Sequence, residues 1–108
     1  MIIYDFGDIV LIQFPHTDMR GVSRRPALIL YDSGDQDVIV ARITSQEQSD
    51  KADFKIPDWG KCGLLDQSYV RLGKLATIDK YCITRKLGNL GNNEMRKLKS
   101  IMKEMFSL

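Results

Sequence analysis

The chain has 108 residues and a formal net charge of +2 at pH 7, and 44% of its residues are hydrophobic. This length favours a single domain over residues 1–108, and the composition argues against a disordered or fibrous protein. No apolar run reaches the roughly 20 residues of a membrane span, and the N-terminus lacks a signal-peptide pattern. We therefore expect a cytoplasmic protein, and the mild charge by itself does not indicate nucleic-acid binding.

Two cysteines and one histidine bear on the question of disulfides and metals. Cys62 and Cys82 are not the cysteine framework of a small secreted protein, which favours free thiols. His16 is far in sequence from both cysteines, whereas a zinc site needs clustered ligands. We expect no structural metal and no cofactor.

Apolar, β-branched segments bounded by turn residues predict three strands in the first half of the chain, at residues 8–14, 27–31 and 38–43. Residues 32–37 have turn chemistry, so the second and third strands should form an antiparallel hairpin. A polar loop is expected before the second strand, and it ends in the Arg-Arg-Pro sequence of residues 24–26.

The second half of the chain predicts shorter or interrupted strands. Residues 54–56 form a short strand that stops at Pro57, and residues 69–72 and 74–78 form one long strand interrupted at Gly73. A glycine in this position suggests a bulge or sharp bend, which lets a small sheet curl into a barrel.

The C-terminal segment has helical periodicity, because its apolar residues recur every three or four positions. They are Met95, Leu98, Ile101, Met102, Met105 and Phe106. Asn92 or Asn93 could cap this helix, and Gly91 would end the strand before it. The methionines are interpreted as core rather than as a partner surface. We therefore expect a mainly β fold: a small, strongly bent antiparallel barrel with a C-terminal amphipathic helix.

The order of motifs over residues 7–45 is Gly-Asp-strand-Phe-Pro, Arg-Pro-strand and strand-Ile-Thr-Ser. This order resembles the MazF/PemK family of type II toxin–antitoxin toxins, and residues 68–79 resemble the family's later strand pair. The resemblance implies an SH3-like barrel, a homodimer and a metal-independent endoribonuclease that cuts single-stranded mRNA sequence-selectively and so inhibits translation and growth. It also implies a cognate antitoxin, which we expect to bind through an acidic, disordered tail.

Metal-free RNA cleavage usually relies on two histidines, which one subunit of this chain cannot supply. Arg25 is the first candidate, because its planar guanidinium can hold two phosphate oxygens and Pro26 stiffens the backbone beside it. The resemblance implies a catalytic role for the arginine before this proline. With a pKa above about 12, arginine is better suited to charge stabilisation than to proton donation.

The resemblance implies that Thr44 contacts the scissile phosphate, and Ser45 offers a second hydroxyl donor. Arg71 matches an arginine that the PemK branch uses catalytically. Gly73, however, stands where that branch has an aspartate proposed as general base.

Without that aspartate, another residue must act as the general base. His16 and Asp18, in the loop expected after the first strand, are the nearest substitutes, and a histidine side chain ordinarily titrates near neutral pH. Arg24 and Lys74 add positive charge for substrate binding. The aromatic residues available to stack on bases are Phe14, Tyr31, Trp59 and Tyr69. For Trp59, packing beneath its own loop is the favoured interpretation.

Two other functions remain open at this stage. CcdB-type toxins use the same barrel to poison DNA gyrase, but they end in a tail with a tryptophan, which residues 105–108 lack. The chain could also be a non-catalytic SH3-like module that binds nucleic acid.

Overall fold

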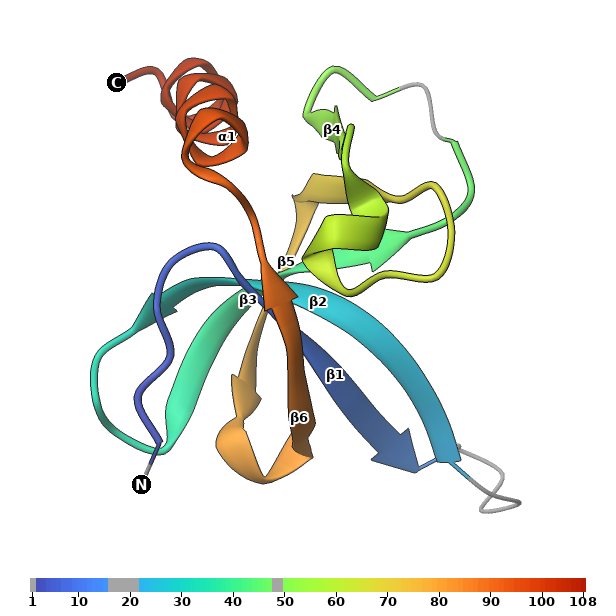
Figure 1. Ribbon diagram of the computed structural model, residues 1–108. Coiled ribbons are helices and arrows are strands. Elements are labelled where there is room, and N and C mark those ends of the chain that lie inside the picture. The colour runs from blue at the N-terminus through green and yellow to red at the C-terminus, as the bar shows by residue number, and fades with distance from the viewer. Residues whose placement is uncertain (1, 16–21, 48–49) are drawn as a thin grey trace.

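The computed structural model describes residues 2–15, 22–47 and 50–108. It contains one six-stranded antiparallel sheet with the strand order β4-β5-β3-β2-β1-β6. The strands are β1 (Asp8–Pro15), β2 (Val22–Asp32), β3 (Asp37–Thr44), β4 (Asp53–Lys55), β5 (Tyr69–Asp79) and β6 (Ile83–Asn89). Two short 3₁₀ helices, η1 (Trp59–Cys62) and η2 (Lys80–Cys82), precede and follow β5, and helix α1 (Asn92–Met105) ends the chain (Figure 1). The predicted mainly β fold with a terminal helix is confirmed.

Both faces of the sheet carry apolar side chains, because neighbouring residues of a strand point to opposite faces. One face holds a core cluster that includes Ile9, Leu28, Ala41, Ile43, Val70 and Leu72. The other face holds a second cluster of Val10, Ile12, Ala27, Ile29, Val38, Val40 and Ile78. This explains why the first three strands read as nearly continuous apolar runs. Among the described residues, no helix is long and apolar enough to cross a membrane.

Helix α1 covers the first of these clusters. Leu98 is fully buried, and Met95, Ile101, Met102 and Met105 pack against the same cluster. Phe106, the sixth apolar residue of the predicted stripe, follows the helix and is 50% exposed. The prediction that the methionines belong to the core is confirmed. The predicted asparagine cap is wrong, because the helix is capped by Gly91 and no side chain caps it. The helix begins directly after Gly91, so both asparagines lie inside its first turn. Just before the helix, the amide of Leu90 donates to the carbonyl of Gly7 at 2.9 Å.

Strand β2 begins five residues before the predicted boundary. Arg24 and Arg25 therefore lie in a strand and not in a loop, paired with Gln13 and Ile12 of β1. Pro26 is tolerated there because pairing with β3 begins only at Ala27, so β2 has one neighbouring strand at the proline. The ladder to β1 outweighs the local polar sequence.

Strand β5 contains the predicted irregularity. Ala41 of β3 lies opposite Leu75, but the next residue, Arg42, lies opposite Arg71, so three residues of β5 around Gly73 have no partner in β3. The bulge at Gly73 is confirmed. It bends β5, and the first part of this strand also pairs with β4.

The barrel closes where η1 packs against β6, and two glycines allow this close approach. A Cβ atom at Gly88 would lie 2.2 Å from the carbonyl oxygen of Cys62, and one at Gly63 would lie 2.0 Å from the carbonyl oxygen of Leu87. Gly63 also has φ of +87°, which side chains other than glycine's rarely adopt. Only glycine fits at this backbone crossing.

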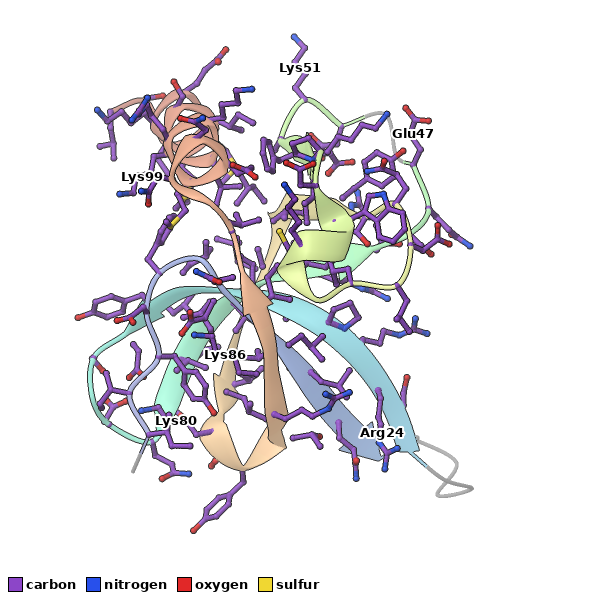
Figure 2. The ribbon with its side chains drawn as sticks, in the orientation of Figure 1. Arg24, Glu47, Lys51, Lys80, Lys86 and Lys99 are labelled. Atoms are coloured by element: carbon purple, nitrogen blue, oxygen red, sulfur yellow. The ribbon has the colours of Figure 1, made fainter. Side chains whose placement is uncertain are left out.

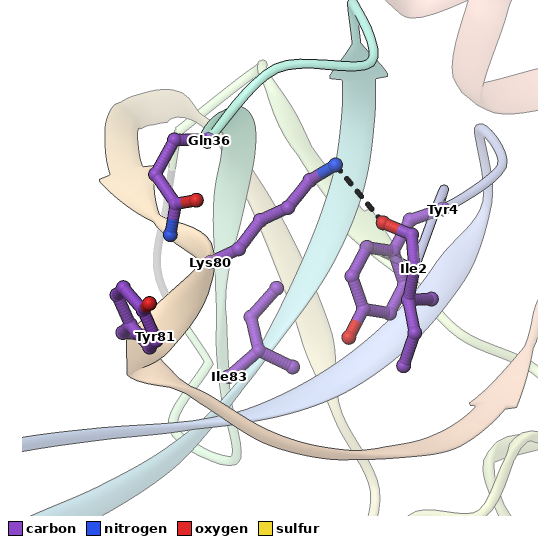
Figure 3. A pocket seen from close by; sticks show the side chains of 6 residues that line it. All are labelled: Ile2, Tyr4, Gln36, Lys80, Tyr81 and Ile83. Atoms are coloured by element: carbon purple, nitrogen blue, oxygen red, sulfur yellow. Dashed lines mark hydrogen bonds between the residues drawn. The ribbon is translucent and has the colours of Figure 1, made fainter.

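A buried lysine anchors the N-terminal segment. Nζ of Lys80 lies 3.0 Å from Oδ2 of Asp32. The same Nζ donates to the carbonyl oxygen of Ile2 at 3.0 Å (Figure 3). The amide of Tyr4 donates to the same carboxylate at 2.7 Å. This backbone hydrogen bond from Tyr4 is the main reason why the pKa of Asp32 lies below its usual value.

Candidate functional site

A groove of about 790 Å³ runs past β1, β2 and β3 to the loop that follows η1. Four residues predicted from the sequence line it together: Arg24, Arg25, Thr44 and Ser45. Arg24 marks the end of the β1–β2 ribbon that lies far from helix α1 (Figure 2). The fold thus brings together residues of two different strands that the sequence could only place at strand ends.

The β1–β2 ladder positions the two neighbouring arginines. Arg25 lies opposite Ile12, and Arg24 lies opposite Gln13, whose Oε1 accepts a hydrogen bond of 2.9 Å from Nε of Arg24. Both arginines are exposed. Regular strand geometry, rather than a loop, presents Arg25 to the groove, which suits a group that must hold a fixed position.

Two further arginines line the groove, and reasoning from the sequence missed both. Arg42 lies opposite Ala27, which places it on the same face of the sheet as Arg25, two residues further along. Arg85 belongs to β6 and lies opposite Leu11 of β1. Arg42 could have been found as the single charged residue in an apolar strand, whereas Arg85 becomes relevant only through the pairing of β6 with β1.

None of these four arginines forms an ion pair with a described residue. Because these arginines have no ion-pair partner among the described residues, their positive charge along the groove is not compensated there, and a bound anion would compensate it. Guanidinium groups hold phosphate or carboxylate oxygens in a two-pronged contact. The charge of the groove therefore suits a ligand with several negative charges.

Thr44 is half-buried at the end of β3, and its Oγ1 accepts a hydrogen bond of 3.2 Å from the amide of Gln46. Because the oxygen already acts as acceptor, the hydroxyl proton remains available for donation to a ligand in the groove. Ser45 beside it is exposed. The predicted pair of hydroxyl donors is thus positioned to contact an anion.

Asp66 supplies the one carboxylate among the described residues that line this groove. Its loop is held in shape, because the hydroxyl of Ser68 donates to the carbonyl oxygen of Asp66 at 2.8 Å. The amide side chain of Gln67 donates to the carbonyl oxygen of Ile56 at 2.9 Å, which ties the loop to the end of β4. The sequence offered no signal for Asp66, which stands in an ordinary polar turn.

The other predicted site residues lie elsewhere. Nε of Arg71 is 3.4 Å from Oδ1 of Asp53 on β4, and Arg71 does not line the groove. Oδ2 of Asp53 is buried and has no hydrogen-bond partner among the described residues. Lys74 lines a second hollow, which also includes Arg25. His16 and Asp18 lie outside the described residues, as does the side chain of Phe14.

The aromatic side chains that are described do not line the groove. Trp59 is half-buried in η1 and packs against the first core cluster, as favoured from the sequence. Tyr31 is 59% exposed at the opposite end of β2. Cys62 and Cys82 are both free, and burial raises the pKa of the Cys62 thiol. Among the described residues, no group of three His, Cys, Asp or Glu side chains could hold a metal ion.

Comparison with known structures places this fold among toxins. Toxin MazF-mt6 of Mycobacterium tuberculosis has a TM-score of 0.75 at 25% identity, with 94% of this chain and 97% of that chain covered. An endoribonuclease in complex with its cognate antitoxin from a mycobacterial species has a TM-score of 0.74 at 18% identity, with 95% and 94% covered. The MazE–MazF structure of Deinococcus radiodurans has a TM-score of 0.78 at 17% identity, with 99% of both chains covered.

No curated protein sequence matches the chain. The family model of the PemK-like, MazF-like toxins of type II toxin–antitoxin systems matches residues 5–106, which is nearly the whole chain. The chain belongs to the PemK-like, MazF-like toxin family of type II toxin–antitoxin systems.

Proposed function

We propose that this chain is a metal-independent endoribonuclease that cuts single-stranded mRNA sequence-selectively and thereby inhibits translation and growth. The observation that carries the proposal is the groove lined by Arg25, Thr44 and three further arginines, none of which has an ion pair among the described residues. Membership of the toxin family supports it, as does the likeness of the fold to a solved endoribonuclease.

The reaction begins with attack of a ribose 2′-OH on the adjacent phosphorus and ends with a 2′,3′-cyclic phosphate and a free 5′-hydroxyl group. Negative charge develops on the non-bridging phosphate oxygens, and preorganised donors stabilise it most effectively. Arg25 and Arg42 share one face and supply this charge stabilisation, while the hydroxyl of Thr44 donates a neutral hydrogen bond. Arg24, Arg85 and Ser45 hold neighbouring parts of the strand.

A group near the 2′-OH must accept its proton. His16 and Asp18, which follow β1 in the sequence and lie outside the described residues, remain our candidates, and Asp66 adds a carboxylate that lines the groove itself. Arg71 is held by Asp53, so it reaches the substrate only if that ion pair opens. A pH–rate profile for His16→Ala and Asp66→Asn distinguishes the candidates, since loss of the base removes the acidic limb of the profile.

The groove arginines, which form no ion pair within the described part of the chain, also suit the carboxylates of an acidic antitoxin tail, which we propose to occupy the same groove. A homologous endoribonuclease was solved with its cognate antitoxin, and MazE–MazF was solved from Deinococcus radiodurans. We propose that the protein is cytoplasmic. We also propose a homodimer, because one barrel offers little surface for binding several nucleotides. Light scattering should then give about twice the chain mass of 12.4 kDa, and a strict monomer with full activity would contradict the dimer.

The decisive experiment replaces Arg25. Loss of one preorganised transition-state donor costs about 10²-fold to 10³-fold in rate, so Arg25→Ala should cut single-stranded RNA that much more slowly. Arg25→Lys should recover only part of the activity, because a point charge cannot make the two-pronged contact. Arg96→Ala is the matched control, since Arg96 is exposed on α1 and lines neither the groove nor the adjoining hollow.

The assay is run in EDTA beside a gyrase supercoiling assay. Cleavage that survives EDTA and leaves a 2′,3′-cyclic phosphate supports the proposal. Inhibition of gyrase without RNA cleavage would instead indicate a CcdB-like poison, and binding without either activity would indicate a non-catalytic module. A folded Arg25→Ala protein that cuts at the wild-type rate would refute the assigned role.

A further inference from the structure

A second hollow of about 390 Å³ adjoins the groove on the face of the sheet that carries the second core cluster. It shares Arg25, Pro26 and Arg42 with the groove, so the two spaces meet at these residues. The floor of the hollow is apolar and consists of Ile12, Val40, Leu75, Ala76 and Ile78.

Small side chains and strand irregularity create this space. Ala76 of β5 lies opposite Val40 of β3, and both residues line the hollow, where a side chain larger than that of Ala76 would occupy more of the space. Lys74, which lies in the bulge of β5 directly before Leu75, also lines the hollow. The result is an apolar floor beneath a rim of positive charge.

We propose that this hollow is a nucleobase site, which takes one base of the RNA strand while Arg25 and Arg42 hold the adjacent phosphate. The inference rests on the proposed function, because it takes RNA as the ligand. A nucleotide combines an apolar π-face with a charged phosphate, and the hollow offers an apolar floor beside two shared arginines.

Size and polar groups agree with this occupant. The volume lies within the range of about 300–1,000 Å³ typical of sites for small organic ligands. Guanidinium groups at the rim can also stack on a base plane. Ser23 is the neutral hydrogen-bonding side chain of the rim, and its hydroxyl group can donate to or accept from a base edge. The hollow therefore contributes to the choice of cleavage sequence.

The test fills the hollow. Ala76 is exposed, so Ala76→Phe places a ring over the apolar floor without replacing a core residue. The control is Thr77→Phe, because Thr77 is the next residue of β5, is also exposed, points to the other face of the sheet and does not line the hollow. Ala76→Leu, a smaller filling, should give an intermediate effect.

Affinity is measured with 2′-fluoro RNA, which lacks the attacking hydroxyl, and with an abasic oligonucleotide that has the same number of phosphates. Ala76→Phe should weaken binding of the base-bearing strand by about 5-fold to 150-fold, the range expected for loss of one stacked base. Binding of the abasic strand should stay at the wild-type value, because the phosphate contacts remain. Thr77→Phe should change neither affinity.

Unchanged affinity of Ala76→Phe for the base-bearing strand would overturn the inference, as would an equal loss for the abasic strand. A change in molecular mass without a change in RNA affinity would overturn it as well, since the hollow would then seat a second copy of the chain. The ribonuclease proposal is tested separately. If the wild-type protein binds the base-bearing strand more tightly than the abasic strand but does not cut RNA, the nucleobase site is supported and the ribonuclease activity is refuted.

Discussion

Binding of single-stranded RNA should weaken steeply with salt, because four arginines without ion pairs among the described residues line the groove. Each neutralised phosphate contributes a slope of about −0.7 to the plot of log affinity against log salt for a single strand. Four contacts per chain predict a slope of about −2.8, and Arg42→Ala should reduce it to about −2.1. Between 50 and 200 mM salt, affinity should then fall roughly 50-fold for the wild type and roughly 20-fold for the variant.

The assay is a fluorescence-anisotropy titration of 2′-fluoro RNA at four or more salt concentrations. Arg96→Ala serves as control, because it removes the same charge from the exposed surface of α1, outside the groove. The slope should stay at the wild-type value in this control. If Arg42→Ala and Arg96→Ala changed the slope equally, binding would depend on net charge, and the assignment of the groove would be refuted.

The remaining predictions concern catalysis, packing and pH. Thr44→Ala should slow cleavage by about 3-fold to 10-fold, less than Arg25→Ala, because a neutral hydrogen bond is weaker than a charged one; single-turnover rates measure this, and a loss larger than that of Arg25→Ala would reverse the assigned roles. Gly88→Ala should lower the free energy of unfolding by about 1–3 kcal/mol in urea denaturation, since overpacking costs about that much and its Cβ would meet the Cys62 carbonyl oxygen; wild-type stability would show that this crossing is not tight. The lowered pKa of Asp32 stabilises the fold above the ordinary value of 3.8, and this contribution is lost as the pH falls from there through the folded-state pKa. Asp32→Asn should therefore flatten the dependence of stability on pH below about 4 in acid-unfolding curves, and an unchanged slope would exclude Asp32 as the group responsible.

Local patterns in the sequence were sufficient for much of the fold. The strands β1 and β3 and the helix α1 follow from apolar periodicity, which reports burial within a few neighbouring residues. Strand β6 could not be recognised in this way, because Thr84, Arg85 and Lys86 are exposed and no alternation marks it. Its identity depends on hydrogen bonds to β1, more than 70 positions away in the chain. The asparagine cap failed because the helix begins earlier than a cap at Asn92 or Asn93 requires, with Gly91 at the capping position.

The site divides in the same manner. The order of motifs along the sequence by itself determined the toxin family and pointed to Arg25 and Thr44. Each motif consists of residues adjacent in the chain, so it can be recognised without knowledge of the tertiary structure. Only the tertiary structure decided that Arg42 and Arg85 join them, and that Arg71 instead pairs with Asp53. The physical reason is that strand register sets which distant side chains share a face, and a shift of one residue would move each of them to the other side of the sheet.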